Sequence, residues 1–260
     1  MIWSPLNKPI RNWTDRRVWV VGASSGIGAA LVRALLDAGA RVVLSARREE
    51  ELLAVADGHP AAVVIPFDAL DVTAWATALE RVTQVLGEID LVVLGAARYD
   101  PQHAWSLDMS QVKASYELNV ISVYQAVSVL SPRLLGQRHG GIAVIGSISS
   151  YTGLPRAIVY GATKAALQNF TETLYLDLAP KGLSVYLISP GFVQTQMTAG
   201  NDFPMPGLMT PQAAAAAILK GMAKGLFEIR FPWGFANVLR WISRLPYRLR
   251  FFLLRRTTRV

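Results

Sequence analysis

The 260-residue chain contains no cysteine, which excludes disulfides and thiolate metal sites. Its three histidines, His59, His103 and His139, are scattered without paired metal-ligand spacing, so we expect no metal site. No stretch reaches the ~18 uninterrupted apolar residues of a transmembrane helix. The first 14 residues lack the apolar core of a secretory signal. These absences predict a cytoplasmic protein, either soluble or bound to a surface.

Charged residues make up only 17% of the chain and hydrophobic residues 52%, which allows a large buried core and is too apolar for disorder. The formal net charge of +8 is unevenly distributed. Residues 230–260 hold eight arginines and no acid, whereas the preceding residues balance to zero. General nucleic-acid affinity is therefore not needed to explain the charge.

Short β-branched runs alternate with longer helical segments along most of the chain. The predicted strands are residues 17–21, 41–45, 61–67, 90–94, 141–146, 183–188 and 227–231. The predicted helices are residues 27–37, 48–56, 73–86, 110–134, 159–178 and 211–224. Several strands are continuously apolar, as expected where helices cover both faces of a sheet. The alternation predicts an α/β fold, a doubly wound parallel β-sheet of the Rossmann type.

The chain shows no internal repeat, no low-complexity linker and no change of composition before residue 230. We therefore predict an N-terminal extension over residues 1–16 and a single Rossmann-fold domain over residues 17–232. Residues 233–260 would form a basic, amphipathic helical tail.

A glycine-rich turn follows the first predicted strand and opens directly into a helix. Its sequence is Gly22-Ala23-Ser24-Ser25-Gly26-Ile27-Gly28. Glycine allows the backbone to turn tightly and approach a pyrophosphate, and the helix N-terminus supplies free N–H groups and partial positive charge. In this position the turn predicts a dinucleotide site. An ordinary strand–helix turn is the alternative.

The second predicted strand ends with Arg47 and Arg48, where a dinucleotide fold holds the adenosine ribose. An acidic residue there would bind the ribose 2′-hydroxyl of NAD(H), whereas arginine can pair with the 2′-phosphate of NADP(H). The first acid is Glu49. We therefore expect NADP(H) rather than NAD(H). The alternative is that the two arginines are only solvent-exposed residues at the start of a helix.

Tyr160 and Lys164 lie one turn apart on one face of a predicted helix, and Ser147 lies thirteen residues before Tyr160, at the end of a strand. Open α/β sheets bind ligands at that edge. Tyrosine, with a pKa near 10, is a poor base at neutral pH. An ammonium about 4 Å away contributes ~4 kcal/mol at an effective dielectric near 20, so we expect Lys164 to lower the pKa of Tyr160. Ser147 would hydrogen-bond the substrate oxygen.

The turn and the Ser-Tyr-Lys set, in this order, resemble the short-chain dehydrogenase/reductase family, and the resemblance extends from about Val18 to Phe231. It implies a catalytic role for Asn119, which would support a water that leads protons to the lysine; a tolerated polar residue in a helix is the alternative. It also implies that Asp68 contacts adenine, with Asp71 as a competitor. The further cofactor contacts that it implies are Ala96, Tyr160, Lys164, Pro190, Gly191, Val193 and Thr195.

One position departs from the family pattern. After the fourth strand the family has Asn-Asn-Ala-Gly or Asn-Ala-Gly, whereas this chain has Leu94-Gly95-Ala96-Ala97. In the family this asparagine braces neighbouring strands and the loop beside the cofactor. With glycine there, we expect less local rigidity and weaker cofactor binding, with the proton chemistry unaffected.

The resemblance implies an NADP(H)-dependent oxidoreductase that transfers a hydride between nicotinamide and a carbonyl or alcohol, and we expect it to reduce ketones. The alternative is a dinucleotide-binding regulator without turnover. The segment with Met197, Phe203, Met205, Leu208 and Met209 would cover a pocket for a hydrophobic substrate, acyl, lipid-like or aromatic; core packing explains these residues nearly as well. The family also implies a homodimer or homotetramer built through the helices containing Asn119 and Tyr160.

The basic tail has two helical patterns. Phe235, Val238, Leu239, Ile242 and Leu245 form an apolar stripe, and Arg240, Arg244 and Arg248 repeat every four residues. After Pro246, the segment adds Phe251, Phe252, Leu253 and Leu254 before Arg255 and Arg256. An apolar stripe bordered by arginines and aromatic residues is typical of a helix that lies in the headgroup layer of a membrane, so one interpretation is that residues 233–260 contact a membrane surface. A cover over the substrate cleft or a dimer partner is a second interpretation. Nucleic-acid binding is a third and is not expected, because no reading element is recognisable.

Overall fold

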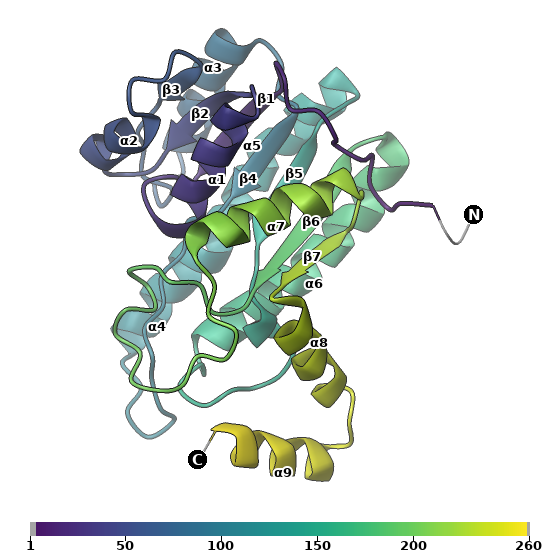
Figure 1. The fold of residues 1–260 in the computed structure, drawn as a ribbon. Helices are drawn as coiled ribbons and strands as arrows, with labels where there is room; N and C mark the ends of the chain where they lie inside the picture. The colour runs from purple at the N-terminus through teal and green to yellow at the C-terminus, as the bar shows by residue number, and fades with distance from the viewer. Residues whose placement is uncertain (1–3, 259–260) are drawn as a thin grey trace.

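The structure, a computed structural model, describes residues 4–258. Its centre is a sheet of seven parallel strands in the order β3-β2-β1-β4-β5-β6-β7 (Figure 1). The strands are β1 Arg17–Val21, β2 Arg41–Ser45, β3 Ala62–Val64, β4 Leu91–Leu94, β5 Gly141–Ile145, β6 Ser184–Pro190 and β7 Glu228–Phe231. This order, with a crossover helix between strands, confirms the doubly wound Rossmann fold.

Helices cover both faces of the sheet, α1 and α7 on one and α5 and α6 on the other (Figure 1). The long helices are α1 Gly26–Asp37, α2 Glu49–Ala56, α3 Ala74–Leu86, α4 Met109–Tyr116, α5 Ser122–Gln137, α6 Tyr160–Leu178 and α7 Pro211–Ala223. Short helical turns are η1 Glu117–Ile121, η2 Ile148–Ser150 and η3 Ala179–Lys181. Two helices, α8 Trp233–Ile242 and α9 Tyr247–Thr258, form the tail.

The core consists of two apolar layers separated by the sheet. Side chains of α1, α2 and α7 pack on one face, and those of α3, α5 and α6 pack on the other. All four residues of β4 are buried, because a central parallel strand is covered on both sides. The continuous apolar runs in the sequence therefore correspond to central strands.

Two predicted elements differ from the structure. The strand predicted over residues 61–67 is only Ala62–Val64, although Ile65 and Phe67 still donate their N–H groups to the carbonyls of Leu44 and Ala46 at 2.9 and 3.1 Å. The helix predicted over residues 110–134 spans α4 to α5 but contains a π-helical turn, η1, in its middle. Within residues 4–258, none of the helices is both long enough and apolar enough to cross a bilayer.

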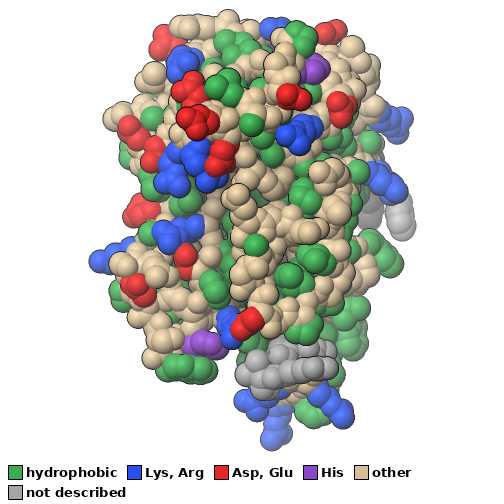
Figure 2. All heavy atoms as spheres, turned by 60° about the vertical axis from the view of Figure 1, so that its left-hand side comes forward, with side chains coloured by type: hydrophobic (Ala, Val, Ile, Leu, Met, Phe, Trp, Pro, Cys, Tyr) green, Lys and Arg blue, Asp and Glu red, His purple; other side chains and the backbone are tan. Residues whose placement is uncertain are grey.

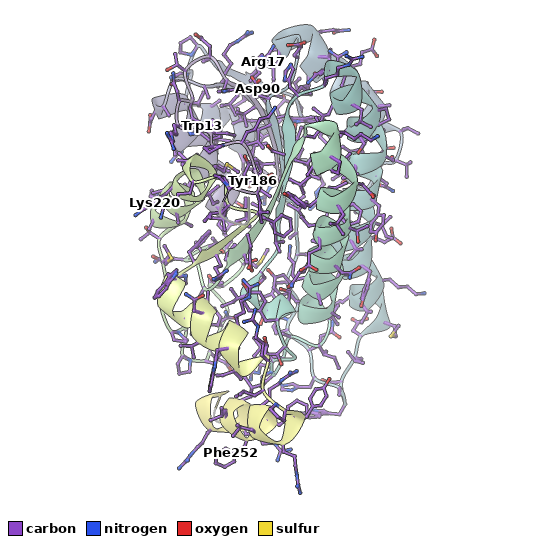
Figure 3. The ribbon with its side chains drawn as sticks, turned by 90° about the vertical axis from the view of Figure 1, so that its right-hand side faces the viewer. Trp13, Arg17, Asp90, Tyr186, Lys220 and Phe252 are labelled. Atoms are coloured by element: carbon purple, nitrogen blue, oxygen red, sulfur yellow. The ribbon has the colours of Figure 1, made fainter. Side chains whose placement is uncertain are left out.

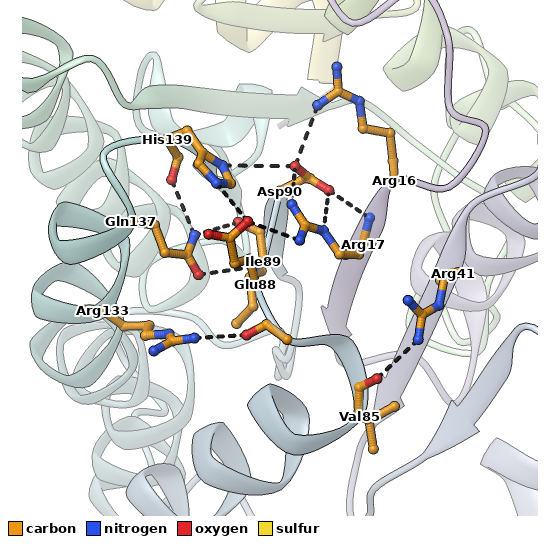
Figure 4. A network of polar contacts seen from close by, with 11 residues as sticks. Arg16, Arg17, Arg41, Val85, Glu88, Ile89, Asp90, Arg133, Gln137 and His139 are labelled. Atoms are coloured by element: carbon orange, nitrogen blue, oxygen red, sulfur yellow. Dashed lines mark hydrogen bonds and ion pairs between the residues drawn. The ribbon is translucent and has the colours of Figure 1, made fainter.

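A polar network closes the amino-terminal edge of the sheet (Figure 4). Arg17 at the start of β1 pairs with Asp90 at 2.9 Å and with Glu88 at 3.1 Å. The side chain of Gln137, at the end of α5, donates to the carbonyl of Ile89 and accepts from its N–H, both at 3.0 Å. These contacts join β1, the start of β4 and α5 at the end of the molecule opposite the carboxyl edge of the strands.

Residues 4–16 lie along the domain, although the sequence predicts an extension. The buried side chain of Asn7 donates to the carbonyl of Val185 at 2.8 Å and accepts from its N–H at 2.9 Å. Ile10 donates its backbone N–H to Met222 at 3.0 Å, and Trp13 is buried in the core. This segment therefore packs against β6 and α7.

The apolar stripe predicted to contact a membrane packs mainly against the protein itself. Leu239 and Ile242 are buried beside η2, and Phe235 packs against the same cluster. Leu245 is half-buried, and Val238 alone in the stripe is exposed. This part of the tail therefore covers the domain, and a membrane contact through residues 233–260 stays a prediction for the side chains that the tail leaves exposed.

Candidate active site

A cleft of about 300 Å³ lies along the carboxyl edge of the sheet. It is lined by seventeen of the eighteen different residues that the sequence assigns to catalysis or cofactor binding: Gly22, Ser24, Ser25, Gly26, Ile27, Gly28, Arg47, Arg48, Asp68, Ala96, Ser147, Tyr160, Lys164, Pro190, Gly191, Val193 and Thr195. Asn119 is not among the lining residues. The fold thus brings these residues together from seven separate segments of the chain.

The glycine turn brings the backbone of β1 close to the start of α1. Gly22 has a φ of +84°, a left-handed conformation that favours glycine. A Cβ on Gly28 would lie 2.1 Å from the carbonyl oxygen of Gly22. Ser25, the N-cap of α1, makes no side-chain capping bond. The first N–H groups of the helix therefore remain directed at the cleft, as binding of a phosphate requires.

The loop after β6 closes over this turn. A Cβ on Gly26, whose φ is +57°, would lie 2.9 Å from Cγ2 of Thr195. Thr198 holds the loop in shape, since its hydroxyl accepts from the N–H of Thr195 at 3.1 Å and donates to the carbonyl of Val193 at 2.7 Å. Gly26 therefore permits the two cofactor-binding segments to touch.

Arg47 and Arg48 differ in their partners at the adenosine end of the cleft. Arg48 pairs with Glu51 at 2.7 Å and donates to the hydroxyl of Ser24 at 3.4 Å. Arg47 is exposed and has no ion-pair partner among residues 4–258. Its guanidinium is thus available to an anionic group, whereas Arg48 already has a carboxylate beside it.

The two candidate aspartates for adenine have separate positions. Asp68 lines the cleft, and its carboxylate accepts from the N–H of Leu70 at 3.0 Å. Asp71 accepts from the N–H and the hydroxyl of Thr73 at 2.9 and 2.7 Å, at the start of α3. The position of Asp68 in the cleft favours it over Asp71.

Ser147 lies at the end of β5, where the strand gives way to η2. Its buried hydroxyl oxygen accepts from the N–H and the hydroxyl of Ser149 at 3.1 and 3.0 Å. The Ser147 hydroxyl donates to the carbonyl of Pro190 over a long 3.4 Å. Because that bond is weak, the proton can turn to a ligand in the cleft at little cost.

Tyr160 and Lys164 extend from the first turn of α6 into the same wall. The Lys164 ammonium lies 5.6 Å from the centre of the Tyr160 ring and donates to the carbonyl of Ile145 at 2.8 Å. Burial lowers the pKa of Lys164 to about 8. Burial also raises the pKa of Tyr160 to about 12, although a hydrogen bond with Ser147 acts in the opposite direction.

The prediction that Lys164 lowers the pKa of Tyr160 is therefore wrong for this structure. That argument considered only the attraction between the two charges. In the structure the loss of hydration on burial has the largest influence on the pKa of Tyr160, and the ammonium lies beside the ring with its hydrogen bond directed to a backbone carbonyl. Tyr160 is thus protonated at neutral pH.

Asn119 is fully buried in the π-helical turn η1, a distortion frequent at functional sites. Its amide donates to the carbonyl of Arg98 at 2.9 Å and to the hydroxyl of Thr163 at 3.1 Å. Its side-chain oxygen accepts from the N–H of Arg98 at 2.8 Å. Asn119 therefore ties the loop after β4 to α6 from behind the cleft wall.

Neighbouring residues fill the space beside Gly95, the glycine that departs from the family pattern. A Cβ at this position would lie 2.9 Å from Cδ1 of Ile145 and 3.2 Å from the carbonyl oxygen of Val21. The Gly95 N–H donates to that carbonyl at 2.9 Å. Ile145 thus occupies the space that a larger side chain would need, and its own carbonyl binds Lys164.

The structure also places residues near the site that no motif indicates. The ring of Tyr99 packs edge-on against Tyr160, with 5.1 Å between the ring centres. Arg156 forms an ion pair with Asp202, joining the segment before α6 to the loop after β6. Tyr99, Arg156 and Asp202 lie in loops whose paths depend on tertiary contacts, so sequence spacing gives no signal for them. Met197, which the sequence places in the segment over the substrate pocket, lines the cleft.

A parallel sheet with a glycine turn and a serine, tyrosine and lysine at its carboxyl edge defines a class of dinucleotide-dependent oxidoreductases. A sequence model of the short chain dehydrogenase family matches residues 16–203. The protein therefore belongs to the short chain dehydrogenase family.

Relatives and solved structures agree with this assignment. An uncharacterized oxidoreductase of Myxococcus xanthus is 35% identical over 235 residues, covering 89% of this chain and 93% of the relative. A short chain dehydrogenase from Burkholderia cenocepacia, in complex with NADP, has a TM-score of 0.83 at 26% identity, covering 94% of this chain and 98% of that one. A 3-ketoacyl-(acyl-carrier-protein) reductase from Brucella melitensis, complexed with NADH, has a TM-score of 0.80 and covers 86% of this chain and all of that one; at 22% identity it shows the fold alone.

Proposed function

We propose that this protein is an NADP(H)-dependent reductase that converts a hydrophobic carbonyl compound to an alcohol. The observation that carries the proposal is the position of Ser147, Tyr160 and Lys164 in one wall of the glycine-lined cleft. The cofactor, when bound, supplies the hydride for the carbonyl carbon. The residues of this chain then have to bind the cofactor, hold the carbonyl oxygen and give it a proton.

The cleft fits a dinucleotide at both of its ends. The uncapped N-terminus of α1 and the close approach of Gly28 to Gly22 suit a pyrophosphate. Arg47, exposed and without a carboxylate partner among residues 4–258, suits the 2′-phosphate of NADP(H). The similar solved structures contain both kinds of cofactor, NADP in the protein from Burkholderia cenocepacia and NADH in that from Brucella melitensis, so the proposed preference rests on Arg47. Gly191, Val193 and Thr195 would lie beside the nicotinamide.

The protonation state of the tyrosine favours reduction of a carbonyl over oxidation of an alcohol. With its pKa raised to about 12 by burial, Tyr160 carries its proton at neutral pH and acts as the acid. The developing alkoxide is a stronger base than a tyrosinate, so transfer of the proton from Tyr160 to the substrate oxygen is favourable. Ser147 donates a hydrogen bond to the same oxygen.

The surroundings of Tyr160 suggest a hydrophobic substrate. Tyr99 packs against the catalytic ring, and Met197 lines the cleft. Phe203, from the loop after β6, contacts Phe192 with 5.9 Å between the ring centres. These flexible and aromatic side chains suit an acyl, lipid-like or aromatic ketone.

Turnover tests the proposal. The purified protein should oxidise NADPH in the presence of some members of a panel of hydrophobic ketones, followed by absorbance of the reduced nicotinamide. Tyr160→Phe should lower kcat at least ~10²-fold and leave NADPH affinity intact, because it removes only the hydroxyl. A protein that binds NADPH but turns over none of the panel would instead be a dinucleotide-binding regulator. A Tyr160→Phe variant with wild-type kcat would refute the mechanism.

Cofactor preference is tested by separate replacement of the two arginines. Arg47→Ala should weaken NADPH binding at least about tenfold and leave NADH binding nearly unchanged, since it removes a charge-assisted contact to the 2′-phosphate. Arg48→Ala should have the smaller effect, because Glu51 already engages that guanidinium. Equal dissociation constants of the wild-type protein for NADPH and NADH would contradict the assignment.

We also propose that the protein forms a homodimer or homotetramer through α5 and α6. Tyr124 on α5 and Leu176 on α6 expose 51% and 71% of their surface. Large apolar side chains exposed on neighbouring helices often mark an interface with another protein chain. Sedimentation velocity tests this proposal. Tyr124→Ser with Leu176→Ser should shift the protein to a smaller species, and a wild-type protein that sediments as a monomer would refute it.

A further inference from the structure

The last helix, α9, presents one aromatic and basic face to solvent. Tyr247, Phe251 and Phe252 are 67%, 50% and 54% exposed. The exposed arginines Arg248, Arg255 and Arg256 lie between them on the same side of the helix, at spacings of three and four residues. We call these six residues the α9 face. Figure 3 shows Phe252 directed away from the body of the protein, at the end opposite Arg17 and Asp90.

The opposite side of α9 holds the helix to the domain. Leu254 is buried with Leu239 and Ile242 of α8, and Leu253 packs against the same cluster. Burial of this side leaves the α9 face directed outward. The aromatic residues of the α9 face are therefore exposed although the helix itself packs against the domain.

Ion pairs anchor α8, the helix that carries α9. Glu228 in β7 pairs with Arg240 of α8 and with Arg230 at 3.1 Å, and it accepts a hydrogen bond from Tyr151. Arg230 also donates to the side chain of Asn237 at 2.7 Å. Two arginines of the basic segment are thus used inside the protein, whereas those of the α9 face have no carboxylate partner among residues 4–258.

We infer that the α9 face docks the protein on the surface of an anionic phospholipid bilayer. Arginines attract lipid phosphates, and tyrosine and phenylalanine side chains insert at the level of the headgroups. A second copy of the chain fits this face poorly. A two-fold contact would bring the same arginines together, and residues 230–260 contain no acid to pair with them.

Docking through the α9 face would bring the candidate active site to the membrane. The strands begin near Arg17 and Asp90, so their carboxyl ends and the cleft lie toward the end occupied by α9 (Figures 1 and 3). Phe235 of α8 stacks against Phe192 with 6.0 Å between the ring centres, and Phe192 contacts Phe203 of the loop after β6. The tail is thus in contact with the loop beside the cleft. In Figure 2, basic side chains project from this end of the molecule.

Co-sedimentation of the full chain with lipid vesicles tests the inference without any need for turnover, so its outcome is independent of the proposed function. The protein should sediment with vesicles of phosphatidylcholine and phosphatidylglycerol and stay in the supernatant with phosphatidylcholine alone. Arg255→Gln with Arg256→Gln should lower the affinity about 25-fold, since each basic residue near an anionic surface contributes about fivefold. Phe251→Ser with Phe252→Ser should lower it at least about tenfold. Raising the salt to about 1 M should release the wild-type protein.

Matched variants separate the α9 face from general effects of charge and apolar exposure. Arg33→Gln with Arg81→Gln removes two exposed arginines from α1 and α3, and Leu53→Ser removes an apolar side chain that is 55% exposed on α2. Both controls should bind vesicles like the wild type. Unchanged thermal unfolding of all variants would show that the tail still packs.

Three results would overturn the inference. The first is a wild-type protein that stays in the supernatant with anionic vesicles at low salt. The second is equal vesicle binding by the wild type and both α9-face variants. The third applies to a wild-type protein that does not bind vesicles. If the α9-face variants then change the oligomeric state, or lose retention of a DNA or RNA oligonucleotide, the face serves a second copy or a nucleic acid.

Discussion

Replacement of Lys164 by methionine should make the protein more stable while it removes activity. Lys164 is only 2% exposed, and burial lowers its pKa from the usual 10.5 to about 8. At pH 7 that difference corresponds to a cost of about 3 kcal/mol in the free energy of unfolding. Methionine can fill the same space without a charge. It leaves the carbonyl of Ile145 without the donor now 2.8 Å away, which costs about 1–3 kcal/mol. A net gain of about 1 kcal/mol is expected.

The dependence on pH is the sharper signature of this buried cation. Between about pH 8 and 10.5 the unfolded chain keeps a proton on Lys164 that the folded protein has released. The unfolded state therefore binds more protons, and the stability of the wild type rises with pH by up to about 1.4 kcal/mol per pH unit relative to a chain without this lysine. From pH 7 to about 9.5, the advantage of Lys164→Met should shrink by about 2 kcal/mol.

Urea unfolding at the two pH values measures this change. Lys113→Met, which removes an exposed lysine from α4, is the control and should leave the pH dependence unaltered. NADPH turnover by Lys164→Met should fall at least ~10²-fold. If wild type and Lys164→Met differ by the same free energy at both pH values, the ammonium is hydrated in the folded protein, and the argument from burial fails.

Three further changes test other parts of the structure. Gly28→Ala should weaken NADPH binding at least about tenfold in a calorimetric titration, since the new methyl group would lie 2.1 Å from a carbonyl oxygen of the turn; an unchanged dissociation constant would argue against this site. Burial opposes ionisation of Asp90, but hydrogen bonds from Arg17 hold its pKa below the usual value, so this carboxylate stabilises the fold above about pH 4 and loses that effect as pH falls through the lowered pKa. Asp90→Asn should therefore unfold more easily than the wild type at pH 7, and the gap should close on acidification; a constant gap would contradict the assignment. Asn119→Ala should lower the free energy of unfolding by about 1–3 kcal/mol, because Arg98 loses partners for both its N–H and its carbonyl, and a variant as stable as the wild type would show that water replaces the amide.

The sheet could be predicted from the sequence because its signals are local. A continuously apolar run such as that of β4 is required wherever helices cover both faces of a strand. Strand boundaries were less predictable, because they depend on pairing with the neighbouring strand: β3 ends at Val64 although the apolar run continues to Ile65. The π-helical turn at Asn119 could not be predicted, since the same apolar spacing suits an uninterrupted helix.

The candidate site could be located from motifs, but its electrostatics could not. The spacing of Tyr160 and Lys164 establishes that both lie on one side of α6. It does not reveal how much water each group loses, and that loss determines the direction of both pKa shifts. The same holds for Gly95. Its effect depends on Ile145, a residue on another strand that reaches into the vacant space.

In the tail, the helical periodicity of the sequence did not predict what the apolar side of each helix contacts. A helical repeat distinguishes the sides of a helix, but it does not say whether the apolar side meets the protein or a membrane. The stripe of α8 has the spacing of an interfacial helix, yet Leu239 and Ile242 are buried against the domain. The aromatic residues of α9 were part of the same basic segment, and only the packing of Leu254 leaves Phe251 and Phe252 outside. The membrane contact that we infer therefore uses the α9 face, because Leu239 and Ile242 of the more regular stripe already pack against the domain.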